Sequence, residues 1–193
     1  MLSAVATEKT EIETAGLVLE PLSPSSIAYA ALLFDLLNDW DVVKMLAEVP
    51  WPLRLEDVAS FLARQPSDSG DDFAIVAVST PIGVATVKRP GSGEPPRKMP
   101  RLGYWIGRKY WRQGYGAEAI GALVDFAFRT YPSEKIGAGV FHDNVASRRL
   151  LQKLDFTDIG VNSIYSRSRG TDVETADMQI TRAAWTTRSL VAR

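Results

Sequence analysis

The feature that most constrains this fold is a pair of glycines placed where an apolar helix begins. Residues 110–119 read YWRQGYGAEA, and IGALVDFAF follows directly. Apolar side chains then recur at helical spacing, at Ile120, Leu123, Val124, Ala127 and Phe128. This repeat predicts a helix from Tyr115 to Arg129 with one face against a sheet. Because glycine disfavours helix, Gly114 and Gly116 must serve another purpose at this junction.

A phosphate group is one such purpose. The unpaired N–H groups and the dipole at a helix N-terminus favour an anion. Gly114 and Gly116 would let the backbone approach phosphate oxygens without an intervening Cβ, and Arg108, Lys109 and Arg112 add local positive charge. An ordinary strand-to-helix turn with an exposed basic cluster explains this segment equally well.

A dinucleotide site is a second interpretation of the same glycines. Residues 114–119 fit G-x-G-x-x-A, the fingerprint of NAD(P)-dependent oxidoreductases, and Asp143 follows the next expected strand, where a ribose-binding acid belongs. However, that fingerprint normally follows a strand directly and opens a fold of repeated βαβ units. Here the preceding strands are hairpin-linked, which makes this the weaker alternative.

The order of elements predicts a mixed α+β fold. Strands are expected at 17–22, 73–78, 82–87, 101–107, 135–141, 158–165 and 174–181, and helices at 26–37, 39–46, 55–65, 115–129 and 144–154. Most strands follow one another as in a meander, and the helix at 115–129 makes a crossover to a parallel neighbour. We expect one domain at 17–182, a flexible arm at 1–16 and a C-terminal tail at 183–193.

Composition excludes several classes of protein. A chain of 193 residues with 46% hydrophobic content supports one core, and a net charge of −1 argues against nucleic acid as a partner. There is no cysteine and one histidine, His142, so we expect no disulfide, cysteine nucleophile or metal site. The N-terminus lacks a signal-like segment and no apolar stretch could cross a bilayer, so we expect a soluble cytoplasmic protein with no membrane partner.

A second segment, HDNVASRRLLQKLDF at 142–156, predicts another helix. Asn144 stands where an N-cap belongs, and Leu150, Leu151 and Leu154 form an apolar stripe. Helical spacing puts Ser147 on the same stripe, so its hydroxyl is expected to face the sheet. The alternative is that Asn144 only caps the helix and Ser147 bonds to nearby backbone.

Together the two segments resemble the GNAT superfamily of acetyl-CoA-dependent N-acetyltransferases, in the branch that includes RimJ and RimL. Residues 111–116 occupy the superfamily's [QR]-x-x-G-x-[GA] loop, with Trp111 departing at the first position. The branch pattern N-x-x-S-x-R-x-x-x-K-L-G-F is matched by Asn144, Ser147, Arg149, Lys153, Leu154 and Phe156. Asp155 replaces its glycine, at a helix end that favours a left-handed residue. The resemblance extends over most of the chain.

The resemblance implies a mostly antiparallel central sheet with a splayed strand pair and helices on both faces. The strand at Gly103–Gly107 would splay from its neighbour at a bulge and bind the pantetheine arm of acetyl-CoA, the co-substrate, which needs no metal. A primary amine would attack the thioester directly in a ternary complex. The cofactor-binding residues implied are Trp105, Ile106, Gly107, Trp111, Arg112, Gln113, Gly114, Tyr115, Gly116, Ala117, Asn144 and Arg149.

The resemblance leaves the catalytic groups and the acceptor open. Many relatives place a tyrosine seven positions after the asparagine, where this chain has Leu151, so Ser147 becomes the candidate catalytic donor, or only a hydrogen-bond partner of the sulfur. The base is either His142 or a water chain ending at a carboxylate. The acceptor is a protein N-terminus, amino acid, polyamine or antibiotic, and a homodimer is compatible with the family.

The walls expected around the acceptor are Trp40, Glu48, Trp51 and the loop Tyr165–Asp172. Core packing for the tryptophans and a solvated loop for the charges are the simpler explanations, which we favour. A non-catalytic acyl-CoA sensor is a further alternative with the same fold.

Overall fold

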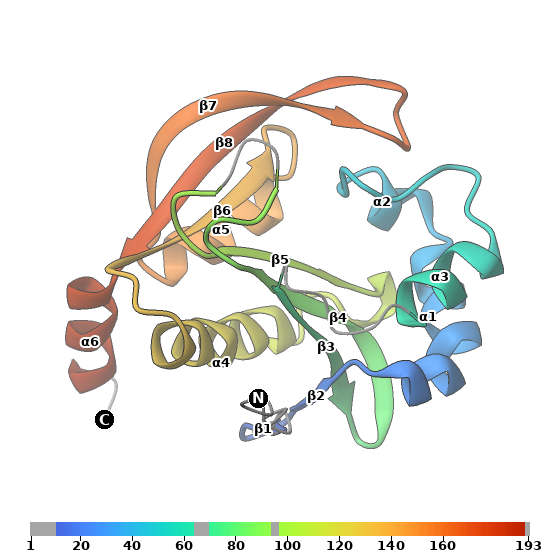
Figure 1. Ribbon diagram of the computed structural model, residues 1–193, viewed down its shortest axis with the longest axis horizontal. Coiled ribbons are helices and arrows are strands. Elements are labelled where there is room, and N and C mark those ends of the chain that lie inside the picture. Colours follow the sequence, from blue (N-terminus) through green and yellow to red (C-terminus); the bar gives the residue numbers. More distant parts are fainter. Residues whose placement is uncertain (1–10, 64–69, 94–96, 192–193) are drawn as a thin grey trace, which may run out of the picture.

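The computed structural model describes residues 11–63, 70–93 and 97–191, and its framework is one sheet with the strand order β1-β2-β3-β4-β5-β6-β8-β7 (Figure 1). The strands are β1 (Ile12–Glu13), β2 (Val18–Pro21), β3 (Gly70–Ala77), β4 (Thr80–Lys88), β5 (Arg101–Ile106), β6 (Lys135–Phe141), β7 (Thr157–Ser166) and β8 (Thr171–Thr181). The helices are η1 (Pro24–Tyr29), α1 (Ala30–Leu37), α2 (Trp40–Val43), α3 (Leu55–Leu62), η2 (Arg108–Tyr110), α4 (Tyr115–Thr130), α5 (Val145–Lys153) and α6 (Arg182–Val191).

Neighbouring strands in this sheet are antiparallel except β5 and β6, which are parallel and joined by the α4 crossover. This confirms the predicted mixed α+β fold. It also removes the main support for a dinucleotide fold, because the described sheet holds a single parallel pair instead of a series of βαβ units.

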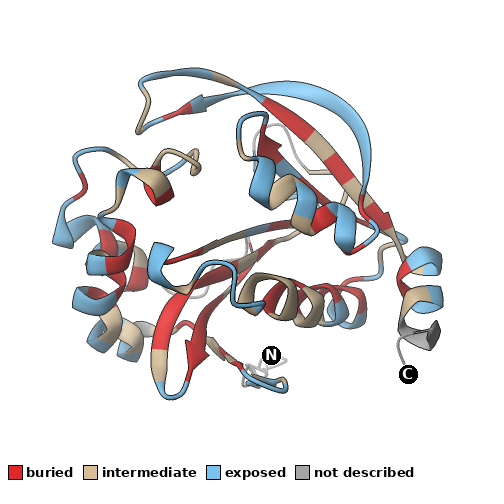
Figure 2. Ribbon diagram, turned by 180° about the vertical axis from the view of Figure 1, so that it is seen from behind, coloured by how far each residue is buried: buried red, intermediate tan, exposed pale blue. Residues whose placement is uncertain are grey.

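Helices cover both faces of the sheet (Figure 1). Strand β3 shows why, because it is buried on both sides: Phe73 and Ile75 pack in the cluster with α4 and α5, whereas Ala74 and Val76 pack in the cluster with α1, α2 and α3. Successive side chains of a strand point to opposite faces, so a strand buried throughout requires a layer on each side. The red of the central strands in Figure 2 shows this burial.

The structure has regular elements on both sides of the domain expected at residues 17–182. Of the expected arm, residues 1–10 lie outside the described residues, but Ile12–Glu13 forms β1, and Thr14 donates to Glu118 of α4 at 2.7 Å. The expected tail carries α6, where Trp185 is buried and donates to Asp125 at 2.7 Å. A two-residue strand shows no periodicity from which it could be predicted, and α6 is also held by hydrogen bonds from Arg182 to the carbonyls of Phe128 and Ser133, which leave no pattern in the sequence.

Other helix boundaries lie close to those predicted from the sequence. Helix α4 begins and α5 is capped where predicted, and Asp155 adopts the left-handed φ of 63° that the family glycine would have there. The expected helix at 26–37 begins as the 3-10 turn η1, and α3 ends at Leu62, with residues 64–69 outside the described part. None of the described helices is long and apolar enough to span a bilayer.

The outer hairpin β7–β8 differs from the rest of the sheet. Of the residues in β7, nine of ten are exposed, and the strand pairs with β8 alone. The hairpin arches away from the body, and its tip lies opposite the segment that follows α2 (Figure 1).

Candidate active site

Strands β5 and β6 separate to form a gap in the sheet. They pair only at Arg101 with Gly137 and at Leu102 with Ala138, and then diverge. The splayed pair is therefore confirmed, but β5 keeps a regular register with β4 along its whole length, so the expected bulge is missing from this pairing. Since Gly107 N donates to Ile82 O on β4 at 2.9 Å, strand alternation turns the main-chain groups of residues 104 and 106 toward the gap.

One side chain joins three strands at the base of this gap. Arg101 forms an ion pair with Asp177 of β8. On the way it crosses β6, where a Cβ on Gly139 would lie 3.1 Å from Arg101 Nη2 and one on Gly137 would lie 3.4 Å from Nη1. Asn162 of β7 donates to the other Asp177 oxygen at 3.0 Å. The two glycines thus let an ion pair hold the strands together where their ladder stops.

The loop before α4 presents a row of free donors. The N–H groups of residues 112–116 donate to no protein atom within the described part of the chain. Gly114, the N-cap, has φ 90°, and a Cβ there would meet nothing within 4 Å, so its glycine is required by conformation. Unpaired N–H groups at the start of a 16-residue helix form an anion site.

The second glycine, Gly116, also has a packing role. A Cβ on Gly116 would lie 2.7 Å from Leu150 Cδ1, so this position makes room for α5 against α4. The basic residues near this loop differ in whether they already have an ion-pair partner. Arg108 pairs with Asp41 at 3.0 Å, whereas exposed Arg112 and Arg149 have no ion-pair partner among the described residues and remain available for an anion.

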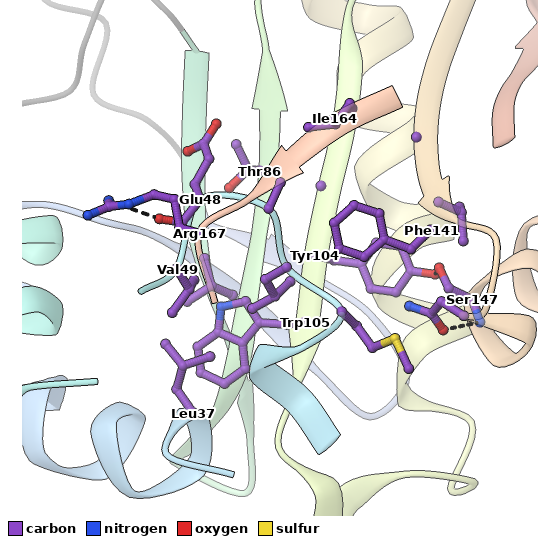
Figure 3. A pocket seen from close by; sticks show the side chains of 18 of the residues that line it. Leu37, Glu48, Val49, Thr86, Tyr104, Trp105, Phe141, Ser147, Ile164 and Arg167 are labelled. Carbon is purple, nitrogen blue, oxygen red and sulfur yellow. Dashed lines mark hydrogen bonds between the residues drawn. The ribbon is translucent and has the colours of Figure 1, made fainter. Parts of the chain in front are cut away.

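A cavity of about 670 Å³ extends from the gap toward α1, α3 and the β7–β8 hairpin (Figure 3). Of the predicted site residues, it brings together Trp105, Asn144 and Ser147. Residues 111–117 do not line it, because they lie outside, around the start of α4; Ile106, Gly107 and Arg149 do not line it either. The indole of Trp111 donates to Ile106 O at 2.6 Å, which ties this loop to the outer end of β5.

A pair of hydroxyl groups lies where the gap meets α5. Asn144 Oδ1 accepts from Ser147 N at 3.1 Å, which caps α5 as expected. The Ser147 hydroxyl faces the sheet, 2.7 Å from the hydroxyl of Tyr104, and both residues line the cavity. Burial raises the pKa of Tyr104 to about 12, and the hydrogen bond with Ser147 opposes this rise. Sequence reasoning missed Tyr104; the available signal was its place between Leu102 and Ile106, which face the same helices.

The far end of the cavity is closed by contacts that we call the clasp, between Arg167–Arg169 and residues 43–48. Arg167 N donates to Ala47 O at 2.9 Å and its guanidinium to Glu48 O at 3.1 Å (Figure 3). Arg169 Nε donates to Lys44 O at 2.7 Å, and its other nitrogens bind Asp143 at 2.8 and 3.1 Å. The hairpin tip is therefore held by main-chain carbonyls of the α2–α3 segment.

The expected acceptor walls are only partly correct. Glu48 and Arg167 line the cavity, but Trp40 and Trp51 do not. These two rings pack against each other at 5.6 Å and are 42% and 40% exposed, so they are not core residues either. His142 pairs with Glu174 at 3.2 Å on the surface, outside the cavity lining. The described residues contain no cluster of acidic or histidine side chains that could hold a metal.

Comparison with known proteins gives a consistent result. A family model described as an acetyltransferase (GNAT) domain matches residues 17–157. A curated relative, the uncharacterized N-acetyltransferase YoaA of Bacillus subtilis, is 40% identical over 74 residues, which are 38% of this chain and 42% of that protein. The match thus spans about two fifths of the length of the curated relatives.

Solved structures share the fold. RimL, a ribosomal-protein alpha-N-acetyltransferase in complex with coenzyme A, superimposes with a TM-score of 0.74 and 17% identity, over 91% of this chain and 99% of that one. The microcin self-immunity acetyltransferase MccE, in complex with acetyl-CoA and AMP, gives a TM-score of 0.71 and 17% identity, over 87% and 93%. At these identities the likeness concerns the fold.

Proposed function

Since the chain belongs to the acetyltransferase (GNAT) domain family, we propose that it transfers the acetyl group of acetyl-CoA to a primary amine by direct attack in a ternary complex. The observation that carries this proposal is the gap between β5 and β6, where strand pairing stops after Leu102 and main-chain groups face a cavity. A pantetheine arm with its two amides is the kind of ligand that an unpaired strand edge binds.

The donor would lie along the gap with its diphosphate on the loop before α4. The free N–H groups of residues 112–116 suit the diphosphate oxygens, and Arg112 and Arg149, which have no ion-pair partner among the described residues, would add positive charge. Of the other residues that the resemblance implies, Trp105–Gly107 would present the strand edge, and Asn144 would contact the cofactor at the cavity wall. MccE and RimL, the neighbours named above, are complexes with acetyl-CoA and coenzyme A respectively.

The chemistry then needs no covalent enzyme intermediate. The amine nitrogen attacks the thioester carbon, the carbonyl oxygen gains charge, and the C–S bond breaks with its electron pair going to sulfur. The N–H of Ile106, which faces the gap, is positioned by strand alternation to stabilise the oxyanion, and one such donor lowers the barrier by about 3 kcal/mol.

The acceptor half of the cavity is mainly apolar, with one free carboxylate. Two carboxylates line the cavity; Asp57 accepts from Arg54 N at 2.9 Å, whereas the Glu48 carboxylate has no partner in the described part of the chain. Glu48 is therefore the group proposed to receive the substrate ammonium, directly or through water. A protein N-terminus, an amino acid, a polyamine and an antibiotic all remain candidates. A cytoplasmic site of action and a homodimer stay predictions.

Two measurements test this function. Free CoA release is followed across a panel of amines, and turnover with at least one amine is the expected result. Thermal shift is measured with acetyl-CoA, CoA, NAD and NADP, because a ligand at about 100 times its Kd stabilises the native state by roughly 2.7 kcal/mol. Stabilisation by NADP and not by acetyl-CoA would support the oxidoreductase alternative. Binding of acetyl-CoA without CoA release for any amine would support the sensor alternative.

A further inference from the structure

Tyr104 and Ser147 form a hydroxyl pair that no sequence motif places together. They are 43 positions apart, on β5 and α5. The phenol lies on the face of the sheet that packs against α4 and α5, and its oxygen is 2.7 Å from the serine oxygen (Figure 3). The serine is fixed from its other side, because Ser147 N donates to Asn144 Oδ1.

The direction of this hydrogen bond follows from the chemistry of the two groups. A phenol is the stronger donor and an aliphatic hydroxyl oxygen the stronger acceptor, so of the two possible directions we assign Tyr104 as the donor and Ser147 as the acceptor. The serine proton is then free to point into the cavity. With its oxygen held by Tyr104 and its backbone held by Asn144, the serine hydroxyl can turn its proton toward the cavity that it lines.

We propose that Tyr104 is a positioning residue that orients the Ser147 hydroxyl toward the sulfur of the leaving thiolate. This rests on the proposed acetyltransferase function. Ser147 donates a hydrogen bond and keeps its proton, as does Tyr104. The C–S electron pair goes to sulfur, the new C–N bond forms at the amine, and the proton lost by the amine goes to Glu48 or solvent. A phenol with a pKa of about 12 does not release its proton to a thiolate.

The test is a double-mutant cycle on kcat, read by CoA release, with Y104F, S147A and the double variant. Y104F is expected to lower kcat about tenfold with the KM for acetyl-CoA changed less than twofold, since one hydrogen bond is lost from the transition state. The double variant is expected to be no slower than S147A, because Tyr104 acts through Ser147. Ser147→Thr, which keeps a hydroxyl, is expected to retain the dependence on Tyr104.

A matched control is Tyr29→Phe. It removes a phenol hydroxyl that donates to Glu20 Oε2 at 2.6 Å, outside the cavity lining, and is expected to leave kcat unchanged. Thermal melts check that each variant is folded. If wild type turns over but Y104F keeps the wild-type kcat, this inference is overturned and the proposed function stands. The same conclusion holds if the losses of kcat in the two single variants multiply in the double variant. Absence of turnover by wild type with every amine overturns the proposed function and this inference with it.

Discussion

The donor half and the acceptor half of the candidate site are built from different parts of the chain. In the donor half, the contact groups are main-chain atoms at the edge of β5 and at the start of α4, both held by regular hydrogen-bond ladders. In the acceptor half, the walls are side chains from short helices and a hairpin tip, joined by the clasp. The contacts of the donor half therefore depend on the path of the backbone, whereas those of the acceptor half depend on the identity of the side chains.

The difference teaches where variation is tolerated. Main-chain donors survive most substitutions, provided that the backbone can keep its path, so only conformationally special positions such as Gly114 are sensitive there. A clasp made by two arginines and one serine can be lost or altered by a single substitution. We therefore expect substitutions in the first half to affect acetyl-CoA, and substitutions in the second to affect the amine.

The largest effect is expected for Gly114→Glu, which places a carboxylate among the free N–H groups before α4. Affinity for acetyl-CoA should fall at least about 100-fold through repulsion of the diphosphate and loss of the anion site. Isothermal titration measures it. Gly114→Ala is the control, because its Cβ meets open space. It adds only the strain of a side chain at φ 90°, which should lower the free energy of unfolding by about 1–2 kcal/mol. Unchanged affinity in Gly114→Glu would mean that the diphosphate binds elsewhere.

The next effect concerns the clasp. Arg169→Ala removes the bonds to Lys44 O and Asp143, so the rim of the acceptor half loses one of its links to the hairpin. The KM for the amine should rise about tenfold, by the loss of hydrogen bonds to a charged group, with the Kd for acetyl-CoA unchanged. Arg148→Ala, which breaks an exposed pair with Asp158, is the control and should change neither constant. A changed Kd for acetyl-CoA in Arg169→Ala would show that the halves are coupled.

Alkaline pH gives a third effect, at the boundary of the two halves. Burial raises the pKa of Tyr104 from 10.0 to about 12, so its contribution to stability is present below pH 10 and is lost as the pH rises through 12. Between pH 8 and pH 11, wild type should lose about 1 kcal/mol more than Y104F. Urea denaturation at both pH values measures this. Tyr29 and Tyr131, whose pKa values are also raised to about 12, are present in both proteins and cancel. Equal losses would place Tyr104 in contact with solvent.

The smallest effect is expected for the cap that carries Ser147. Asn144→Ala removes the acceptor of Ser147 N and should lower the free energy of unfolding by about 1 kcal/mol. Denaturation of the ligand-free protein isolates this from any cofactor contact. Asn144→Asp keeps a side-chain oxygen at the cap and should retain most of the stability. A loss in Asn144→Asp as large as that in Asn144→Ala would argue that the cap is not what holds α5.

The donor half was largely predictable because its signals are local. The apolar stripe around Ile120 fixed α4, and Asn144 marked the start of α5 within one residue. The packing of Gly116 against Leu150 was not predictable, since Leu150 comes from another helix. No spacing rule relates Tyr104 to Ser147, because they lie on different elements, β5 and α5.

The acceptor half was largely hidden because its contacts join distant segments through carbonyl oxygens. Arg169 reaches Lys44 O across 125 positions, and every residue has a carbonyl, so the partner leaves no trace in the sequence. The two tryptophans show the opposite error. Trp40 and Trp51 were expected either in the core or in the walls of the acceptor site, yet their rings pack against each other at the surface.

Arg101 has a consequence for the mechanics of the molecule. In the described sheet, β5 and β6 pair at two positions, and the Arg101–Asp177 ion pair lies beside them, so hydrogen bonding within the sheet is narrowest at this seam. A donor bound in the gap would take the place of the absent ladder and complete the sheet. The ligand would then stabilise the sheet as well as take part in the reaction, and we expect the ligand-free protein to be the more flexible of the two states.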